Sequence, residues 1–265
     1  MIGTCPPQPA VMKKIIRIAH LSDIHIGPSD EPVRQFEVRH NFERTLEDIR
    51  SEMPDLIVMG GDQAAHCGEL DAYRWIKPHL DHTGIPYQIV PGNHDNIDNL
   101  DHIFNLGTER KEHGLYSSKR VNGLKLIFLD SSTTYLDRDQ LEWLKKEADG
   151  SDEVILLFIH HPPLFCNCTF MDSHYPLQNR EEAYAVMSEL PSIQHIFCGH
   201  YHTEKTIREN EKNIYLTPST MMQMSQDNPD YEVNETSPGW RIIQWNGSRL
   251  ETAVRYIHPA STDRG

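Results

Sequence analysis

The stretch Pro91-Gly92-Asn93-His94-Asp95 decides how we interpret the rest of this 265-residue chain. The apolar run 85–90 precedes it and has the length and composition of a β-strand. Proline and glycine end such a strand, so Asn93, His94 and Asp95 come directly after a strand end. Asparagine and aspartate are common turn residues. An amide, an imidazole and a carboxylate brought to one place are also the components of a binding or catalytic site.

Four other predicted strands end in the same kind of polar residue. The short apolar runs are 14–21, 56–59, 154–159 and 193–198. The polar residues that follow them, in chain order, are Asp23 and His25, then Asp62, then His160 and His161, then His200 and His202. Two of these pairs are spaced two residues apart, so in an extended chain their side chains would point the same way. Because parallel strands place their carboxyl ends at one edge of a sheet, we expect all five clusters to converge there.

The segments between these strands have helical periodicity, which predicts an α/β fold. Amphipathic helices are expected over 42–53, 73–80, 137–148 and 179–190, with a short helical stretch over 100–106. From residue 204 onward strands are expected over 206–208, 214–217, 239–245 and 250–257 without intervening helices. Asn246-Gly247 is a typical hairpin turn, so an antiparallel-leaning sheet is expected at this end. We predict one domain over 14–258, with tails at 1–13 and 259–265 and a mobile loop at 227–238. Asp130 also ends a strand and is interpreted as structural or as a support for the metal-binding residues.

Composition excludes several classes of protein. The net charge of −14 argues against a nucleic-acid surface, which needs basic stripes. No segment approaches the roughly 20 apolar residues that span a bilayer. The first ten residues lack the pattern of a secretory signal, and Met12 is a second possible start. Five cysteines, an odd number, favour free thiols in a cytosol over a disulfide framework.

The chemistry of the clustered side chains predicts two metal ions. Carboxylate, amide and imidazole ligands without thiolates suit Mn, Fe, Zn, Ni or Co. Seven or eight such ligands are too many for one ion with open positions, whereas two ions that share a carboxylate fit the number. Such a pair lowers the pKa of a bridging water toward ~7 and binds a phosphoryl oxygen, so that the resulting hydroxide can attack phosphorus.

The ordered motifs resemble those of the calcineurin-like metallophosphoesterase superfamily. These motifs are Asp-x-His at Asp23, Gly-Asp at Asp62, Gly-Asn-His-Asp at Asn93, a histidine at His160, and Gly-His-x-His at His200. The segments 168–174, 217–220 and 238–241 further resemble class III bacterial cyclic-nucleotide phosphodiesterases. Within the first of them, Cys168 and His174 belong either to an ordinary ordered loop or to a loop on the substrate side. The implied fold is a four-layer α/β/β/α sandwich.

The resemblance also implies a role for each residue. Asp23, His25 and His202 would hold the first ion, Asp62 would bridge, and Asn93, His160 and His200 would hold the second, with Mn or Fe as the expected metals. The His-x-Pro pattern of the family favours His160, and His161 is the alternative. His94 would bind the phosphate and protonate the leaving oxygen, and Asp95 would orient His94. The phosphoryl group would lie among His25, Asp62, Asn93, His94 and His202.

These implications lead to one main functional hypothesis and two alternatives. The main hypothesis is a dinuclear metal-dependent phosphodiesterase that hydrolyses 3′,5′-cyclic AMP or a related cyclic nucleotide. The alternatives are a broad-specificity phosphodiesterase or nucleotidase and a catalytically silent metal-binding scaffold. In each case we expect a monomer or homodimer that binds neither nucleic acid nor a membrane. For the two enzymatic hypotheses, the expected partner is a small phosphoester substrate.

Overall fold

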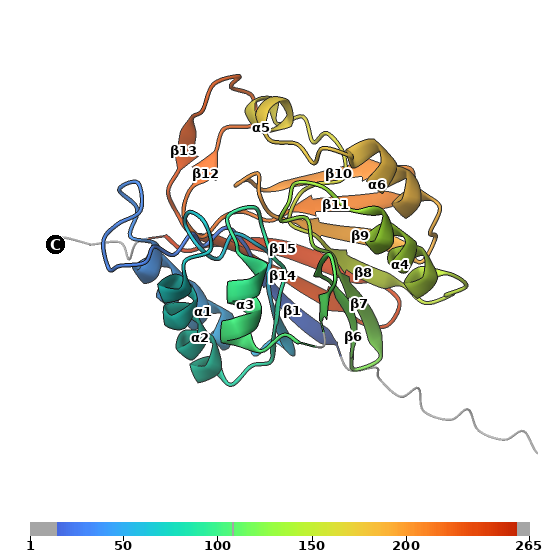
Figure 1. Ribbon diagram of the computed structural model, residues 1–265, viewed down its shortest axis with the longest axis horizontal. Helices are drawn as coiled ribbons and strands as arrows, with labels where there is room; N and C mark the ends of the chain where they lie inside the picture. The colour runs from blue at the N-terminus through green and yellow to red at the C-terminus, as the bar shows by residue number, and fades with distance from the viewer. Residues whose placement is uncertain (1–14, 108, 259–265) are drawn as a thin grey trace, which may run out of the picture.

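The computed structural model describes residues 15–107 and 109–258. Two mixed β-sheets pack face to face, and helices cover the outer face of each sheet (Figure 1). This arrangement confirms the predicted four-layer α/β/β/α sandwich. The predicted tails, 1–13 and 259–265, lie outside the described residues. Within the described part of the chain, no helix is long and apolar enough to cross a membrane.

The first sheet is built from both ends of the chain. Its strand order is β15-β14-β1-β2-β3, where β1, β2 and β3 are parallel and β14 pairs antiparallel with β1. The strands are β1 (Ile16–Leu21), β2 (Leu56–Met59), β3 (Tyr87–Ile89), β14 (Gly239–Trp245) and β15 (Leu250–Tyr256). The helices between them are α1 (Val38–Ser51), α2 (Leu70–Thr83) and α3 (Ile97–Phe104), which lie on its outer face (Figure 1).

The second sheet is formed by the middle of the chain in the order β10-β11-β9-β8-β7-β6. Its strands are β6 (Ser117–Val121), β7 (Leu124–Phe128), β8 (Ile155–Phe158), β9 (Ile193–Cys198), β10 (Lys205–Glu209) and β11 (Lys212–Leu216). Helices α4 (Arg138–Ala148) and α6 (Arg180–Ser188) cover it. The late strands therefore extend both existing sheets. The expectation that they would form a further, antiparallel-leaning sheet is wrong.

Three small elements were not predicted. Helix α5 (Thr169–His174) and the strand pair β12 (Gln223–Met224) and β13 (Val233–Glu235) project together beyond the sandwich (Figure 1). The backbone N–H of Thr169 donates to the carbonyl of Gln226 at 2.7 Å and joins them. Strand β13 falls inside the predicted loop 227–238. The third element is the short pair β4 (Arg110–Lys111) and β5 (Gly114–Leu115).

The core between the sheets is aromatic and aliphatic. Phe158 of β8 stacks between Phe128 of β7 and Phe197 of β9, with ring centroids 5.4 and 5.1 Å apart. From the facing sheet, Ile18 and Val58 pack into the same buried cluster. Full burial of such side chains contributes about 1.5–3 kcal/mol each. This core fixes the two sheets against each other. It therefore also fixes the strand ends from which the loops of the carboxyl edge begin.

Candidate active site

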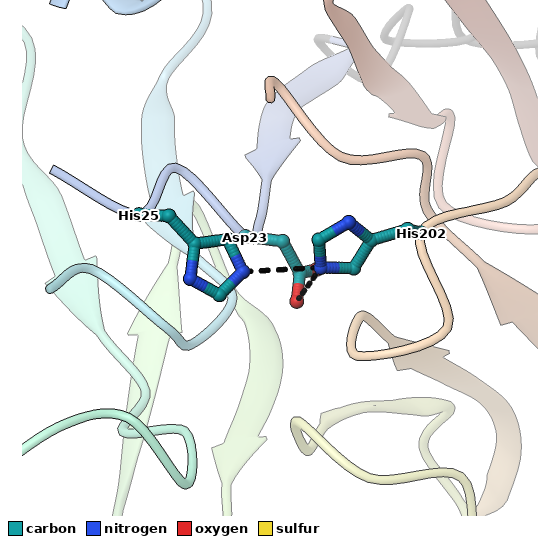
Figure 2. Close-up of side chains that lie close together, drawn as sticks. All are labelled: Asp23, His25 and His202. Carbon is teal, nitrogen blue, oxygen red and sulfur yellow. Dashed lines mark hydrogen bonds and ion pairs between the residues drawn. The ribbon is translucent and has the colours of Figure 1, made fainter. Parts of the chain in front are cut away.

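The first group of site residues comes from the loops after β1 and β9. The Nε2 atom of His202 lies 3.3 Å from Oδ1 of Asp23 and 3.1 Å from Nε2 of His25 (Figure 2). All three side chains are buried, and their potential ligand atoms lie within 4.8 Å of one another. The group has the composition and spacing of a metal half-site.

The second group is formed by Asp62, His160 and His200, whose potential ligand atoms are also within 4.8 Å of one another. His160 Nε2 lies 3.3 Å from Oδ2 of Asp62 and 3.8 Å from Oδ1 of Asp23. His25 Nε2 is 3.8 Å from the same Asp62 oxygen. Asp62 is thus a member of the second group that also faces the first, which is the position that a shared carboxylate needs.

The side chains converge through backbone geometry that differs from our prediction. We expected extended chain at the paired positions, but β1 ends at Leu21. The five residues concerned all have left-handed backbone, with φ between 45° and 66°: Asp23, His25, Asp62, His200 and His202. Such φ values are uncommon outside glycine and concentrate at functional sites, where surrounding structure stabilises them. The left-handed residues of the loops therefore direct these side chains toward one another, and the alternation of side chains along an extended strand is not what brings them together.

Two histidines adjacent in sequence have different surroundings. The Nδ1 of His160 binds the carbonyl of Gly60 at 2.8 Å, which directs Nε2 toward Asp62. His161 instead binds the Ser131 hydroxyl through Nδ1 at 2.9 Å, and its ring lies 4.1 Å from that of His200. His160, but not His161, belongs to the carboxylate-containing group. The geometry therefore favours the choice of His160.

The hydrogen bonds of the Asp95 side chain go to groups other than the His94 ring, which we expected it to orient. Its carboxylate accepts hydrogen bonds from the backbone N–H groups of Gln63, Ala64 and Gly92 and from the Tyr73 hydroxyl. The ring of His94 is held by the carbonyl of Ala65, which lies 2.8 Å from Nδ1. Asp95 thus fixes the loop backbone, whereas a main-chain carbonyl, which has no signature in the sequence, orients the imidazole.

Burial and the two carboxylates control protonation in the site. Burial disfavours a charged His160, but Asp62 and Asp23 outweigh it and raise the pKa of His160 to about 9. Burial would raise the pKa of Asp62, yet the adjacent His160 brings it well below its usual range. Burial lowers the pKa of His25 to about 3, so this imidazole is neutral. The site thus contains two buried carboxylates, which are stabilised by positive charge, and a neutral imidazole beside them. Such a combination is suited to binding a cation.

Atoms without hydrogen-bond partners test whether a metal fits. Among the described residues, the buried atoms without a hydrogen-bond partner include Asn93 Oδ1, His160 Nε2 and, beside them, His161 Nε2. Buried polar atoms are nearly always satisfied, so exceptions require an explanation. Asn93 and His160 are predicted to hold the second ion and His161 is the alternative to His160, and all three atoms are good donors of an electron pair to Mn, Fe or Zn. The residues present therefore fit a metal pair.

The groups open into a cavity of about 340 Å³. His94 lines it beside His25, with ring centroids 4.9 Å apart. The remaining lining was not predicted as site residues and includes Arg34, Phe170, Tyr175, Met221, Met222, Met224 and Tyr231. A larger hollow of about 490 Å³ between α1 and α2 contains none of the predicted site residues.

A family model for calcineurin-like phosphoesterases matches residues 16–204, which include every residue of both groups. The chain belongs to the calcineurin-like phosphoesterase family. The recognition made from the sequence is thereby confirmed, and the members of this family are dinuclear metal-dependent enzymes.

Relatives of this phosphoesterase cover nearly its whole length. A probable cyclic nucleotide phosphodiesterase of Fibrobacter succinogenes is 36% identical over 244 residues, covering 92% of this chain and 95% of that protein. The 3′,5′-cyclic adenosine monophosphate phosphodiesterase CpdA of Escherichia coli is 28% identical and covers 86% and 85%. A dimetal phosphatase from Danio rerio superposes with a TM-score of 0.65 at 13% identity, covering 90% and 98%, which supports the fold.

Proposed function

We propose that this protein is a dinuclear metal-dependent phosphodiesterase that hydrolyses 3′,5′-cyclic AMP or a related cyclic nucleotide. One observation carries the proposal: Asp62 of the second buried group also faces the first, and His94 lies beside His25 and Asp62 in the cavity that both groups line. Two relatives, named as cyclic-nucleotide and cyclic-AMP phosphodiesterases, support this substrate class.

In this proposal each half of the site holds one ion. Asp23, His25 and His202 bind the first, and Asp62 is shared. The second is bound by Asn93, His160 and His200. When bound, such ions polarise a phosphoryl oxygen and lower the pKa of water, and Mn or Fe suits the oxygen and imidazole donors, with Zn, Ni or Co as alternatives.

His94 is the proposed general acid. Its Nδ1 is occupied by the carbonyl of Ala65, which leaves Nε2 to donate a proton to the leaving oxygen of the ester. Because the Ala65 carbonyl can only accept a hydrogen bond, Nδ1 carries a proton, and Nε2 therefore has a proton to donate when the ring is the doubly protonated imidazolium. The free thiols of Cys67, Cys166, Cys168 and Cys198 agree with the cytosolic location that we propose.

Hydrolysis of a substrate panel by the purified, Mn-loaded protein tests the proposal. The panel contains 3′,5′-cyclic AMP, an aliphatic glycerophosphodiester, a nitrophenyl diester and a nucleoside monophosphate. We expect turnover of diesters with the highest kcat/KM for the cyclic nucleotide. Turnover of monoesters alone would assign a phosphatase, and the absence of any turnover with two bound ions would assign a silent scaffold.

A further inference from the structure

The outer wall of the active-site cavity carries exposed aromatic rings that the proposed chemistry does not use. Phe170 of α5 and Tyr231, which precedes β13, meet edge to face with ring centroids 6.0 Å apart, and Tyr175 lies 5.8 Å from Phe170. We call these three residues the aromatic rim. Tyr175 is 54% exposed and Tyr231 is 47% exposed, although both line the cavity. Large aromatic rings left open to solvent at a cavity mouth are typical of ligand contacts.

A second apolar surface lines the same cavity. Met221, Met222 and Met224 are buried, each at most 5% exposed, and all three line the cavity. Thioether side chains are flexible and polarizable and make favourable contacts with aromatic rings. The methionines and the aromatic rim therefore give the cavity two apolar surfaces against which a planar ring can pack.

Both surfaces are tied to the proposed metal ligands. The Ser219 hydroxyl donates to the carbonyl of Asp23 at 2.8 Å and accepts the N–H of Met221 at 2.8 Å, which connects the methionines to the first group. The carbonyl of Tyr175 lies 2.9 Å from Nε2 of His200, which connects the rim to the second group. A ligand bound to these surfaces is consequently held at a fixed offset from the metal-binding residues.

We infer that the aromatic rim and the three methionines form a nucleobase subsite, which makes the enzyme prefer cyclic nucleotides over aliphatic phosphodiesters. The inference rests on the proposed phosphodiesterase function. Phe170 is its central residue, because its ring contacts both tyrosines and also stacks on the imidazole of His174, with ring centroids 4.5 Å apart. A base gains stacking energy on such a surface whatever its hydrogen-bonding edge, whereas a glycerol group has no π-face to stack. The subsite is therefore expected to select a planar ring and to discriminate weakly between bases.

Steady-state kinetics of Phe170→Leu with two substrates tests this subsite. Leucine keeps an apolar side chain but removes the ring. We expect kcat/KM of the Mn-loaded variant for 3′,5′-cyclic AMP to fall about 5- to 150-fold, mainly through KM. The kcat/KM for glycerophosphoethanolamine, an aliphatic diester, should stay unchanged. Phe170→Tyr should restore the cyclic-nucleotide value, and Tyr135→Leu, which removes an exposed ring outside the cavity lining, should match the wild type.

A binding measurement separates this inference from the proposed function. Adenosine carries no phosphate, so saturation-transfer NMR on the diamagnetic Zn-loaded protein reports base binding without turnover. We expect saturation of the base protons in the wild type and its loss in Phe170→Leu. If the wild type hydrolyses diesters but does not saturate adenosine, the subsite is refuted and the function stands. If adenosine is saturated but no diester is hydrolysed, the function fails and base binding stands.

Two further outcomes would overturn the subsite. An equal loss of kcat/KM for both diesters in Phe170→Leu would show that the ring supports the catalytic loops and not the base. A change of molar mass in light scattering with an unchanged KM would show that the rim is a contact between copies of this chain.

Discussion

The backbone N–H of His94 donates a hydrogen bond to Oδ1 of Asp62 at 2.8 Å. The two oxygens of this carboxylate therefore have different partners, because Oδ2 lies 3.3 Å from Nε2 of His160 and 3.8 Å from Nε2 of His25. One residue thus connects the loop that presents the proposed acid with both groups of proposed ligands. Removing its charge and removing its hydrogen bond are expected to have separable effects.

The substitution Asp62→Asn is expected to abolish stable binding of the metal pair while the fold is kept. Asparagine retains an oxygen for the His94 N–H but loses the negative charge that two ions would share. Elemental analysis should find fewer than one ion per chain, and circular dichroism should match the wild type. Asp62→Ala should also lose the loop contact and unfold at a lower temperature. Asp71→Asn, on the exposed surface of α2, is the matched control. Two retained ions in Asp62→Asn would contradict the bridging role.

The substitution His94→Ala is expected to leave the metal content near normal and to lower kcat by about 10²–10⁴-fold for an alkoxide leaving group. The loss should shrink for a nitrophenyl diester, because nitrophenolate departs without a proton. His102→Ala, an exposed histidine on α3, serves as the control for loss of an imidazole. A decrease of the same size for both leaving groups would show that His94 acts in phosphate binding alone.

The substitution Gly61→Ala tests the close packing behind the second group. Gly61 has φ +108°, and a Cβ placed on it would lie 2.1 Å from Nδ1 of His160. The His160 ring cannot move away without losing the Gly60 carbonyl, so metal content and activity should both fall. Gly84→Ala is the control: its φ is +68° and a Cβ there meets nothing within 4 Å. That change should cost about 1–2 kcal/mol of stability and leave activity intact. Full activity of Gly61→Ala would show that the ring is free to shift.

The sequence was sufficient for the part of the site that depends on strand ends. Asp62 follows a buried strand and two glycines, and such an arrangement places a carboxylate at the sheet edge whatever the details of the loop. The contact of Asp95 could not be foreseen, because its partners are mainly backbone N–H groups whose positions depend on the folded loops. The Ala65 carbonyl that orients His94 is invisible in a sequence for the same reason.

The cavity mouth was unpredictable on different grounds. Phe170 and Tyr231 are 61 positions apart by their numbers, and no hydrophobic period links them. Strands β12 and β13 have two and three residues, too short to show alternation. Strand β14, by contrast, has seven residues and was predicted with its correct bounds. Long periodic segments were thus predictable, and contacts made by isolated side chains were not.

His20 gives the stability of the protein a defined dependence on pH. It is buried beneath the site, its Nδ1 lies 2.7 Å from the Thr217 hydroxyl, and burial together with the charge of Arg241 lowers its pKa to about 3. In the unfolded chain His20 has an ordinary histidine pKa near 6.5, so it binds a proton below that pH. In the folded chain His20 stays neutral over the same range. The contribution of neutral His20 is complete above pH 6.5 and is lost as the pH falls from 6.5 toward 3, at about 1.4 kcal/mol per pH unit.

The substitution His20→Gln should remove one proton from this dependence. Urea unfolding of the wild type and the variant between pH 4 and pH 7 gives the slope of the unfolding free energy against pH, and the slope of the variant should be lower by about 1.4 kcal/mol per pH unit. The other buried histidines of the site contribute equally to both proteins, so the difference isolates His20. His82→Gln, which removes an exposed imidazole at the end of α2, should leave the slope as in the wild type. Parallel curves for His20→Gln and the wild type would mean that His20 is protonated in the folded state.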